Sequence, residues 1–168
     1  RVGENLAAQI TLDVWKARHA QCRAAIARLA EVYAEAKPDV AVIVGNDQME
    51  IFDDGLLPAF SILWGQEIVN SMYTEERMAR LPPGIPISVP GHIPPGGATY
   101  EAAPELGLHI IKSAITEGFD VASMKRMPHN ETPHAFGFVF RQIMNDEVTP
   151  SLPIVLNTFY PPNQPTVR

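Results

Sequence analysis

Four polar side chains follow an apolar run in the first third of the chain, and their types suit ligand binding. The run is Val40–Val44, and the polar residues after it are Asn46, Asp47, Gln48 and Glu50. In open α/β sheets, ligands bind beyond the carboxyl ends of the strands. Amides and carboxylates there can hydrogen-bond a substrate or approach a metal ion. This stretch is therefore the first candidate site, although an Asx-turn after the strand remains an alternative role for Asp47.

Histidines supply the second set of candidate groups. His129 and His134 lie five residues apart in RMPHNETPHAFGFVF, each directly after a proline. That spacing does not put them on one helical face, so they converge only through a turn. His92 stands alone in a loop, where a surface or hydrogen-bonded role is the more ordinary expectation. His19 and Cys22 share a helical stripe, and we expect packed core side chains there rather than a metal pair.

Two long helices are predicted to support these groups. Apolar residues recur three and four apart through Thr11–Ala36, with Thr11 as the N-cap and Pro38 as the stop. Pro104–Gly118 is the second helix, with proline in its first turn and glycine at its end. A short helical turn is also expected at Thr74–Arg80.

Four apolar runs are predicted as strands, and they alternate with the helices: Asp39–Gly45, Ala59–Trp64, Phe119–Met124 and Leu152–Asn157. The first run lacks polar alternation, which predicts burial on both faces. Alternating strands and helices indicate an α/β fold with a mostly parallel central sheet flanked by helices.

The segment Leu81–Gly97 has a different character, because it holds six of the 16 prolines and four of the 11 glycines. That density disfavours regular helix or central strand. Its isoleucines and valine predict that it lies against the rest of the protein. We therefore expect a long loop wrapped over the domain, of the kind that often contributes to function.

Composition narrows the class of protein. The chain has 168 residues, 46% of them hydrophobic, which suits one globular domain. The net charge of −6 argues against a nucleic-acid surface. The single cysteine excludes an internal disulfide and fits a cytoplasmic protein, and no apolar run reaches the ~20 residues of a membrane span. The first residue is Arg, so we expect a single domain over 1–168 that is incomplete at both ends.

Three segments together resemble the class III extradiol ring-cleavage dioxygenases, the family of the protocatechuate 4,5-dioxygenase catalytic subunit. They are DVAVIVGNDQMEIFDDGLLPAF, PHAFGFVF and LPIVLNTFYPPNQPTVR. The GNDQMEIF variant is most similar to the methylgallate-type members. The resemblance implies Fe(II) held by two histidines and one carboxylate, with a catechol-type diol and O₂ as substrates. It also implies ring cleavage beside the diol, with a histidine steadying the developing charge.

The resemblance gives roles to particular residues. His134 matches the histidine near substrate and O₂, and is the expected catalytic residue. Gln48 stands where many members have an iron-ligating histidine, and Glu50 offers a carboxylate from the same loop, so both are candidate metal ligands. The remaining ligands are expected outside the chain.

Substrate contacts are expected from Asn46 and Asp47 in the polar stretch and from His129 near the second segment. The expected ligands are a small aromatic diol and O₂, and the protein is expected to form a homo-oligomer or to bind a small partner subunit. Two other hypotheses stay open. One is a dioxygenase-like subunit without metal that acts as a binding or scaffolding partner. The other is an unrelated α/β domain whose polar loop caps a helix.

Overall fold

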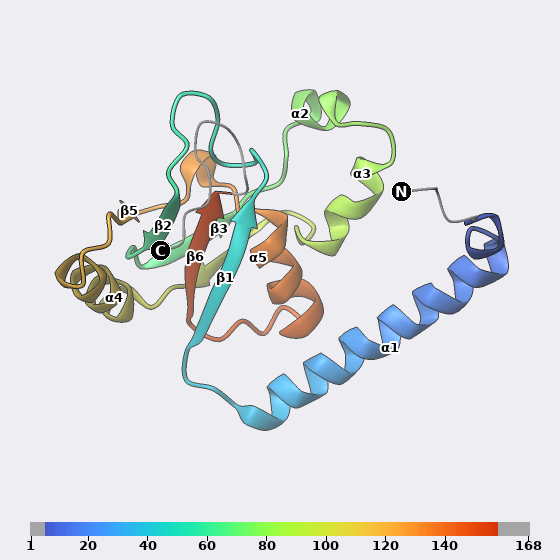
Figure 1. Ribbon diagram of the computed structural model, residues 1–168, viewed down its shortest axis with the longest axis horizontal. Helices are drawn as coiled ribbons and strands as arrows, with labels where there is room; N and C mark the ends of the chain where they lie inside the picture. The colour runs from blue at the N-terminus through green and yellow to red at the C-terminus, as the bar shows by residue number, and fades with distance from the viewer. Residues whose placement is uncertain (1–5, 158–168) are drawn as a thin grey trace.

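The computed structural model describes residues 6–157, and its centre is a four-stranded sheet (Figure 1). The strands are ordered β1-β6-β2-β5, and they span Ala41–Asp47 (β1), Phe60–Leu63 (β2), Ala122–Met124 (β5) and Ser151–Asn157 (β6). β1 pairs with β6 and β2 pairs with β5 in parallel, while β2 and β6 are antiparallel. The predicted α/β fold with a mostly parallel sheet is therefore confirmed.

Helices cover both faces of this sheet. Successive residues of a strand point to opposite faces. Accordingly, Val155 belongs to one core cluster and its neighbour Ile154 packs against the other. The helix α5 (His134–Phe138) covers the first face, and a π-helical turn, Val139–Ile143, continues it. The second face is covered by α4 (Pro104–Thr116), which starts with proline as predicted.

Strand β1 differs from the prediction of burial on both faces. Ala41 and Ile43 pack against the first core cluster, but Val42 and Val44 on the other face are 50% and 59% exposed. The reason is positional, because β1 is the edge strand and α4 packs over β2 and β6 on that face. The apolar run thus predicted the strand correctly, but it did not predict which face of the strand other elements cover.

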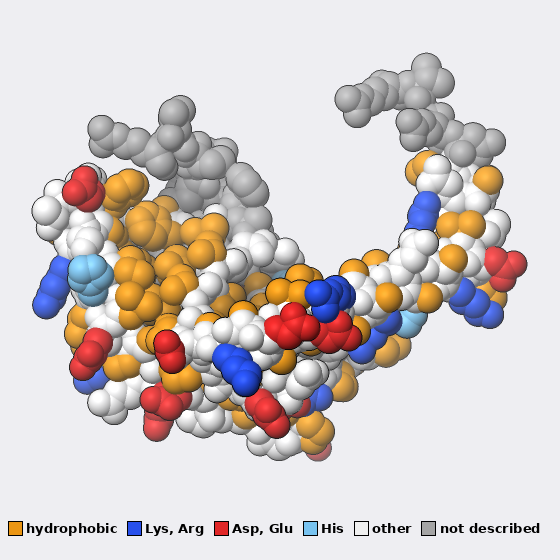
Figure 2. All heavy atoms as spheres, turned by 90° about the horizontal axis from the view of Figure 1, so that it is seen from below, with side chains coloured by type: hydrophobic (Ala, Val, Ile, Leu, Met, Phe, Trp, Pro, Cys, Tyr) orange, Lys and Arg blue, Asp and Glu red, His pale blue; other side chains and the backbone are white. Residues whose placement is uncertain are grey.

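The longest helix is α1 (Leu12–Ala36), and its bounds agree with the prediction. The Thr11 hydroxyl accepts a hydrogen bond from the Val14 N–H, and Lys37 ends the helix in the left-handed conformation. Its main contact with the body is to the π-helical turn, and Figures 1 and 2 show it extending from the body as an arm.

The packed-core interpretation of His19 and Cys22 is wrong, because both side chains are exposed. Trp15 on the same stripe is 60% exposed, whereas Tyr33 near the end of α1 packs against the first core cluster. Helical spacing shows which side chains share a face, but it does not show whether another element covers that face.

The middle of the chain holds elements that the sequence did not reveal. Glu67–Asn70 (β3) and Ala98–Glu101 (β4) form a separate antiparallel pair. Between them lie the predicted short helix, now α2 (Glu75–Arg80), and the Pro/Gly-rich segment. That segment contains α3 (Ile85–Ser88) and a 3₁₀ turn, Val89–Gly91, where helix was not expected. Prolines are tolerated there because each stands in a first turn, which needs no N–H donor.

The Pro/Gly-rich segment is packed on the protein only in part. Val89 and Ile93 are both 2% exposed, whereas Ile85 and Ile87 are 46% and 85% exposed. Within residues 6–157, no helix combines the length and the apolar character that a membrane crossing requires. The tail of the third segment on which the resemblance rests, residues 158–168, lies outside the described residues.

Candidate functional site

The turn after β1 is built around the carboxylate of Asp47, which is 2% exposed. Its Oδ1 accepts hydrogen bonds from the N–H groups of Glu50 and Ile51, both at 3.1 Å, and its Oδ2 accepts one from Phe52 at 3.2 Å. Met49 in this turn has a φ of 59°, a left-handed conformation that costs energy for a residue other than glycine. Burial raises the pKa of Asp47 above its ordinary value even though these three bonds lower it. Asp47 thus determines where Glu50 lies.

Glu50 and His134 form a hydrogen-bonded pair, although they are 84 residues apart in sequence. The distance from His134 Nδ1 to Glu50 Oε1 is 2.5 Å, and the His134 backbone N–H donates to Glu50 Oε2 at 2.9 Å. Gly45 allows this approach of α5 to β1, because a Cβ there would lie 3.0 Å from both Ala135 Cβ and Phe136 Cζ. Both oxygens of Glu50 are therefore engaged by one residue at the start of α5.

The pair shifts both pKa values. The hydrogen bond to Glu50 is the largest effect on His134, and it raises the histidine pKa above its ordinary value against the effect of burial. Burial acts to raise the pKa of Glu50, but the side-chain and backbone hydrogen bonds from His134 outweigh it, so the net shift is downward. The geometry thus favours an imidazolium–carboxylate pair, and it leaves His134 Nε2 for another partner.

An aromatic and cationic group lies beside this pair. The His92 ring lies edge-on to the His134 ring, with centroids 6.2 Å apart, and the Tyr73 ring centroid also lies 6.2 Å from that of His92. Arg77 stands over the Tyr73 ring at 4.3 Å and forms an ion pair with Glu131. Burial lowers the pKa of His92 below its ordinary value, and its Nε2 is buried without a hydrogen-bond partner among residues 6–157.

These residues line a cleft of about 920 Å³ between the body and the inner side of α1. Its lining includes Gln48, Glu50 and His134 from the body, and His19 and Arg23 from α1. The volume is in the range of small-molecule sites, and several apolar side chains complete the lining: Met49, Leu81, Ile85, Ile87 and Phe138.

The structure brings together part of the predicted set. Gln48, Glu50 and His134 all line the cleft. Asn46 is half-buried in β1 and does not line it. His129 is exposed in a short turn with a φ of 58° and lies outside the cleft lining, so the two histidines of that segment do not converge there.

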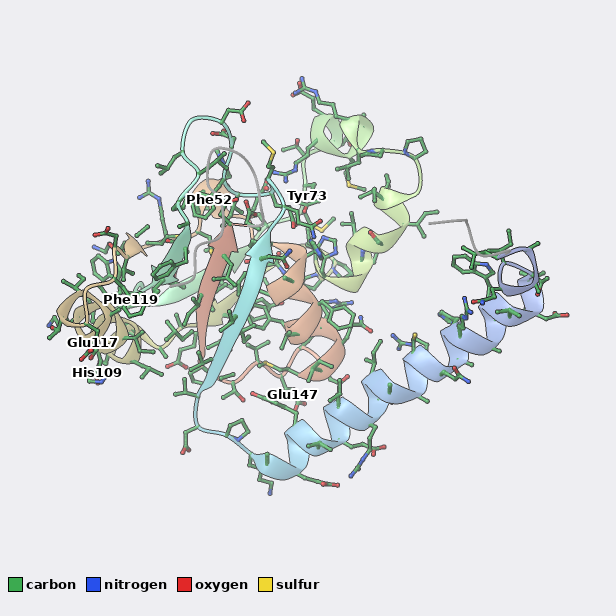
Figure 3. All side chains as sticks on the ribbon, in the orientation of Figure 1. Phe52, Tyr73, His109, Glu117, Phe119 and Glu147 are labelled. Carbon is green, nitrogen blue, oxygen red and sulfur yellow. The ribbon has the colours of Figure 1, made fainter. Side chains whose placement is uncertain are left out.

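Sequence reasoning missed Tyr73, Arg77 and Arg23, and it treated His92 as an ordinary loop residue. His92 is 92% buried, since its exposed fraction is 8%. Its place amid buried apolar residues in a proline-rich loop was the available signal. No local sequence pattern pointed to Tyr73. Figure 3 shows Tyr73 on the far side of the sheet from His109, which lies on α4.

The fit of Fe(II) can be judged from the donors present. Among residues 6–157, no group of three or more His, Cys, Asp or Glu side chains could hold a metal ion. The two oxygens of Glu50 contact His134, and Gln48 offers a neutral amide on an exposed side chain. The described residues therefore do not by themselves fit the two-histidine, one-carboxylate set that the resemblance implies.

Comparison of the chain with models of known protein families gives no match, and comparison with curated proteins gives no significant match. The chemistry of the cleft is therefore the basis for assigning a function.

Proposed function

We propose that this chain supplies the substrate-facing wall of an extradiol ring-cleavage dioxygenase that acts in the cytoplasm. Its substrates are a small aromatic diol of the protocatechuate, gallate or methylgallate class and O₂. The observation behind the proposal is the contact between Glu50 and His134 in the cleft. Glu50 belongs to the GNDQMEIF segment, and His134 belongs to PHAFGFVF. Two segments that resemble the family independently thus meet at one site, which an accidental resemblance would not require.

In this proposal His134 acts on the substrate oxygen. Glu50 holds Nδ1 and raises the histidine pKa, so the ring stays protonated to a higher pH than a free imidazole. The Nε2–H then donates a hydrogen bond to the oxygen on which negative charge develops, and the Glu50 carboxylate balances the imidazolium. Such positioned donors stabilise developing charge because they need no reorganisation during the reaction.

Tyr73 and the apolar lining supply the rest of the binding surface. An aromatic ring can stack on or pack edge-on to Tyr73 and His92, which already lie in a tilted arrangement. The Arg77 guanidinium fixes the Tyr73 ring and also donates to the backbone oxygen of Glu50 at 3.3 Å. Arg77 is therefore a positioning residue that joins the aromatic surface to the acid–base pair.

The proposal assigns Fe(II) to ligands beyond the described residues, since Glu50 is engaged by His134 and Gln48 is a neutral amide. The same two features favour the second candidate, a dioxygenase-like subunit that binds the diol or a partner without metal. Iron content separates the two.

In this proposal the chain is part of a longer protein, and the test uses that complete protein. After anaerobic reconstitution with Fe(II), we expect retained iron and oxygen uptake with protocatechuate, gallate or methylgallate. No retained iron together with no uptake for any diol would reject the dioxygenase and leave the metal-free subunit.

The role of His134 is tested by His134→Ala in the same protein. We expect turnover to fall about 10²- to 10³-fold, in line with the loss of one charge-stabilising donor, while iron content stays near that of the wild type. His109→Ala is the matched control, because His109 is an exposed histidine on α4. Iron loss in parallel with turnover would instead make His134 a ligand.

A further inference from the structure

We propose that Arg23 binds a carboxylate of the ligand, so that the cleft selects aromatic carboxylates over uncharged aromatics of the same size. This inference rests on the proposed function of the cleft as an aromatic-diol site, and it adds a specificity residue on α1. No pattern in the sequence singled out Arg23.

Arg23 is held at the cleft by a defined set of contacts. It follows His19 by four residues on α1, so the two share a helix face, and both line the cleft. Its Nη1 donates to Gln142 Oε1 at 2.8 Å. The Gln142 side-chain amide N–H donates to the Gly91 backbone oxygen at 3.3 Å. This bond keeps the side-chain oxygen of Gln142 turned toward Arg23. The guanidinium is thus positioned by neutral partners.

Two neighbouring arginines are instead paired with carboxylates. Arg77 pairs with Glu131, and Arg28 on α1 pairs with Glu31 and Glu35. Within residues 6–157, Arg23 has no carboxylate partner. A guanidinium has five N–H donors in a planar fork that matches a carboxylate, and the bond to Gln142 uses one of them. Arg23 therefore keeps the capacity for a two-pronged contact with an anionic ligand.

The charge of the cleft lining favours an anion although the whole chain has a net charge of −6. The acidic lining residue is Glu50, and it is already paired with His134. The lining arginines are Arg23 and Arg77, and because Arg77 is paired with Glu131, the positive charge without a carboxylate partner among the described residues is that of Arg23. A cleft with one predominant sign of charge raises the local concentration of the opposite ion.

The cleft lining offers three kinds of contact to one ligand. In this proposal the carboxylate of the ligand contacts Arg23, a hydroxyl contacts His134, and the ring meets the apolar lining. That apolar lining includes Met49 and Phe138. The chemical class that satisfies all three regions is a hydroxylated aromatic carboxylate.

The experiment compares three probes on the complete protein by calorimetry: benzoate, catechol and protocatechuate, which combines the carboxylate and the diol. We expect Arg23→Gln to weaken benzoate and protocatechuate about tenfold or more, as the loss of a charge-assisted contact predicts, and so to reduce the preference for protocatechuate over catechol. Arg23→Lys should restore part of that preference, since it keeps the charge but not the fork.

Arg18→Gln is the matched control, because Arg18 is on the same helix and also bonds a glutamine, but it does not line the cleft. It should leave all three affinities unchanged. An Arg23→Gln variant that keeps the wild-type preference, or that weakens catechol as much as protocatechuate, would overturn the inference. Wild-type binding of benzoate but not catechol, lost in Arg23→Gln, would support it while rejecting the diol function. Binding of none of the probes would reject both.

Discussion

Replacement of Asp47 by alanine is the most informative perturbation, because one buried carboxylate organises the whole turn that presents Glu50. Its loss removes three hydrogen bonds, and the N–H donors of Ile51 and Phe52, both buried residues, are left without an acceptor. An unsatisfied buried donor costs about 1–3 kcal/mol. The substitution also removes the cost of burying a carboxylate, which offsets part of that loss. We therefore expect Asp47→Ala to lower the free energy of unfolding by about 3 kcal/mol.

The assay is urea unfolding of the complete protein, with two comparison variants. Asp47→Asn keeps one acceptor oxygen, so we expect a smaller loss of about 1–2 kcal/mol. Asp53→Ala removes a single exposed hydrogen bond, to Gly55 N–H at 2.8 Å, and should cost less than about 1 kcal/mol. A loss below about 1 kcal/mol for Asp47→Ala, at an unchanged denaturant slope, would refute the role assigned to this turn.

Two further predictions concern the same region. In the folded protein the pKa of His134 is raised and that of Glu50 is lowered. The pair therefore stabilises the fold most between pH 4.5 and pH 6.5, the ordinary pKa values of the two groups. That stabilisation is lost as pH rises through the raised histidine pKa, or falls through the lowered glutamate pKa. Glu50→Gln should therefore reduce the melting temperature most near pH 5.5 and least near pH 9, and a deficit independent of pH would contradict this. Gly137→Ala places a Cβ 2.3 Å from the His92 backbone oxygen, so we expect about 1–3 kcal/mol of destabilisation in urea, whereas Gly91→Ala, whose Cβ meets nothing within 4 Å, should cost less.

Local chemistry was enough to predict the main elements. Thr11 and Pro38 define the limits of α1, and Pro104 marks the start of α4, because caps and prolines act within a few residues of themselves. The four strands of the central sheet were also predicted from apolar runs. The short pair β3 and β4 was missed, since four-residue strands leave little periodicity to read.

Part of the site could be predicted for a similar reason. Glu50 and His134 stand out by residue type and local setting, and both line the cleft. Their mutual contact could not be predicted, because it depends on how closely α5 packs on β1 at Gly45. Asp47 was expected to touch substrate, but its carboxylate is used by the turn beneath the cleft.

The sequence by itself determined the two long helices, the four strands of the central sheet and the polar stretch after β1, because these follow from interactions between residues close in the chain. The tertiary structure alone decided which faces were covered and which polar groups met. Val42 is exposed because α4 covers other strands, and His92 is buried because a loop wraps over the body. Arg23 reaches the cleft because α1 packs on the π-helical turn. Such contacts join segments far apart in sequence, so no local pattern encodes them.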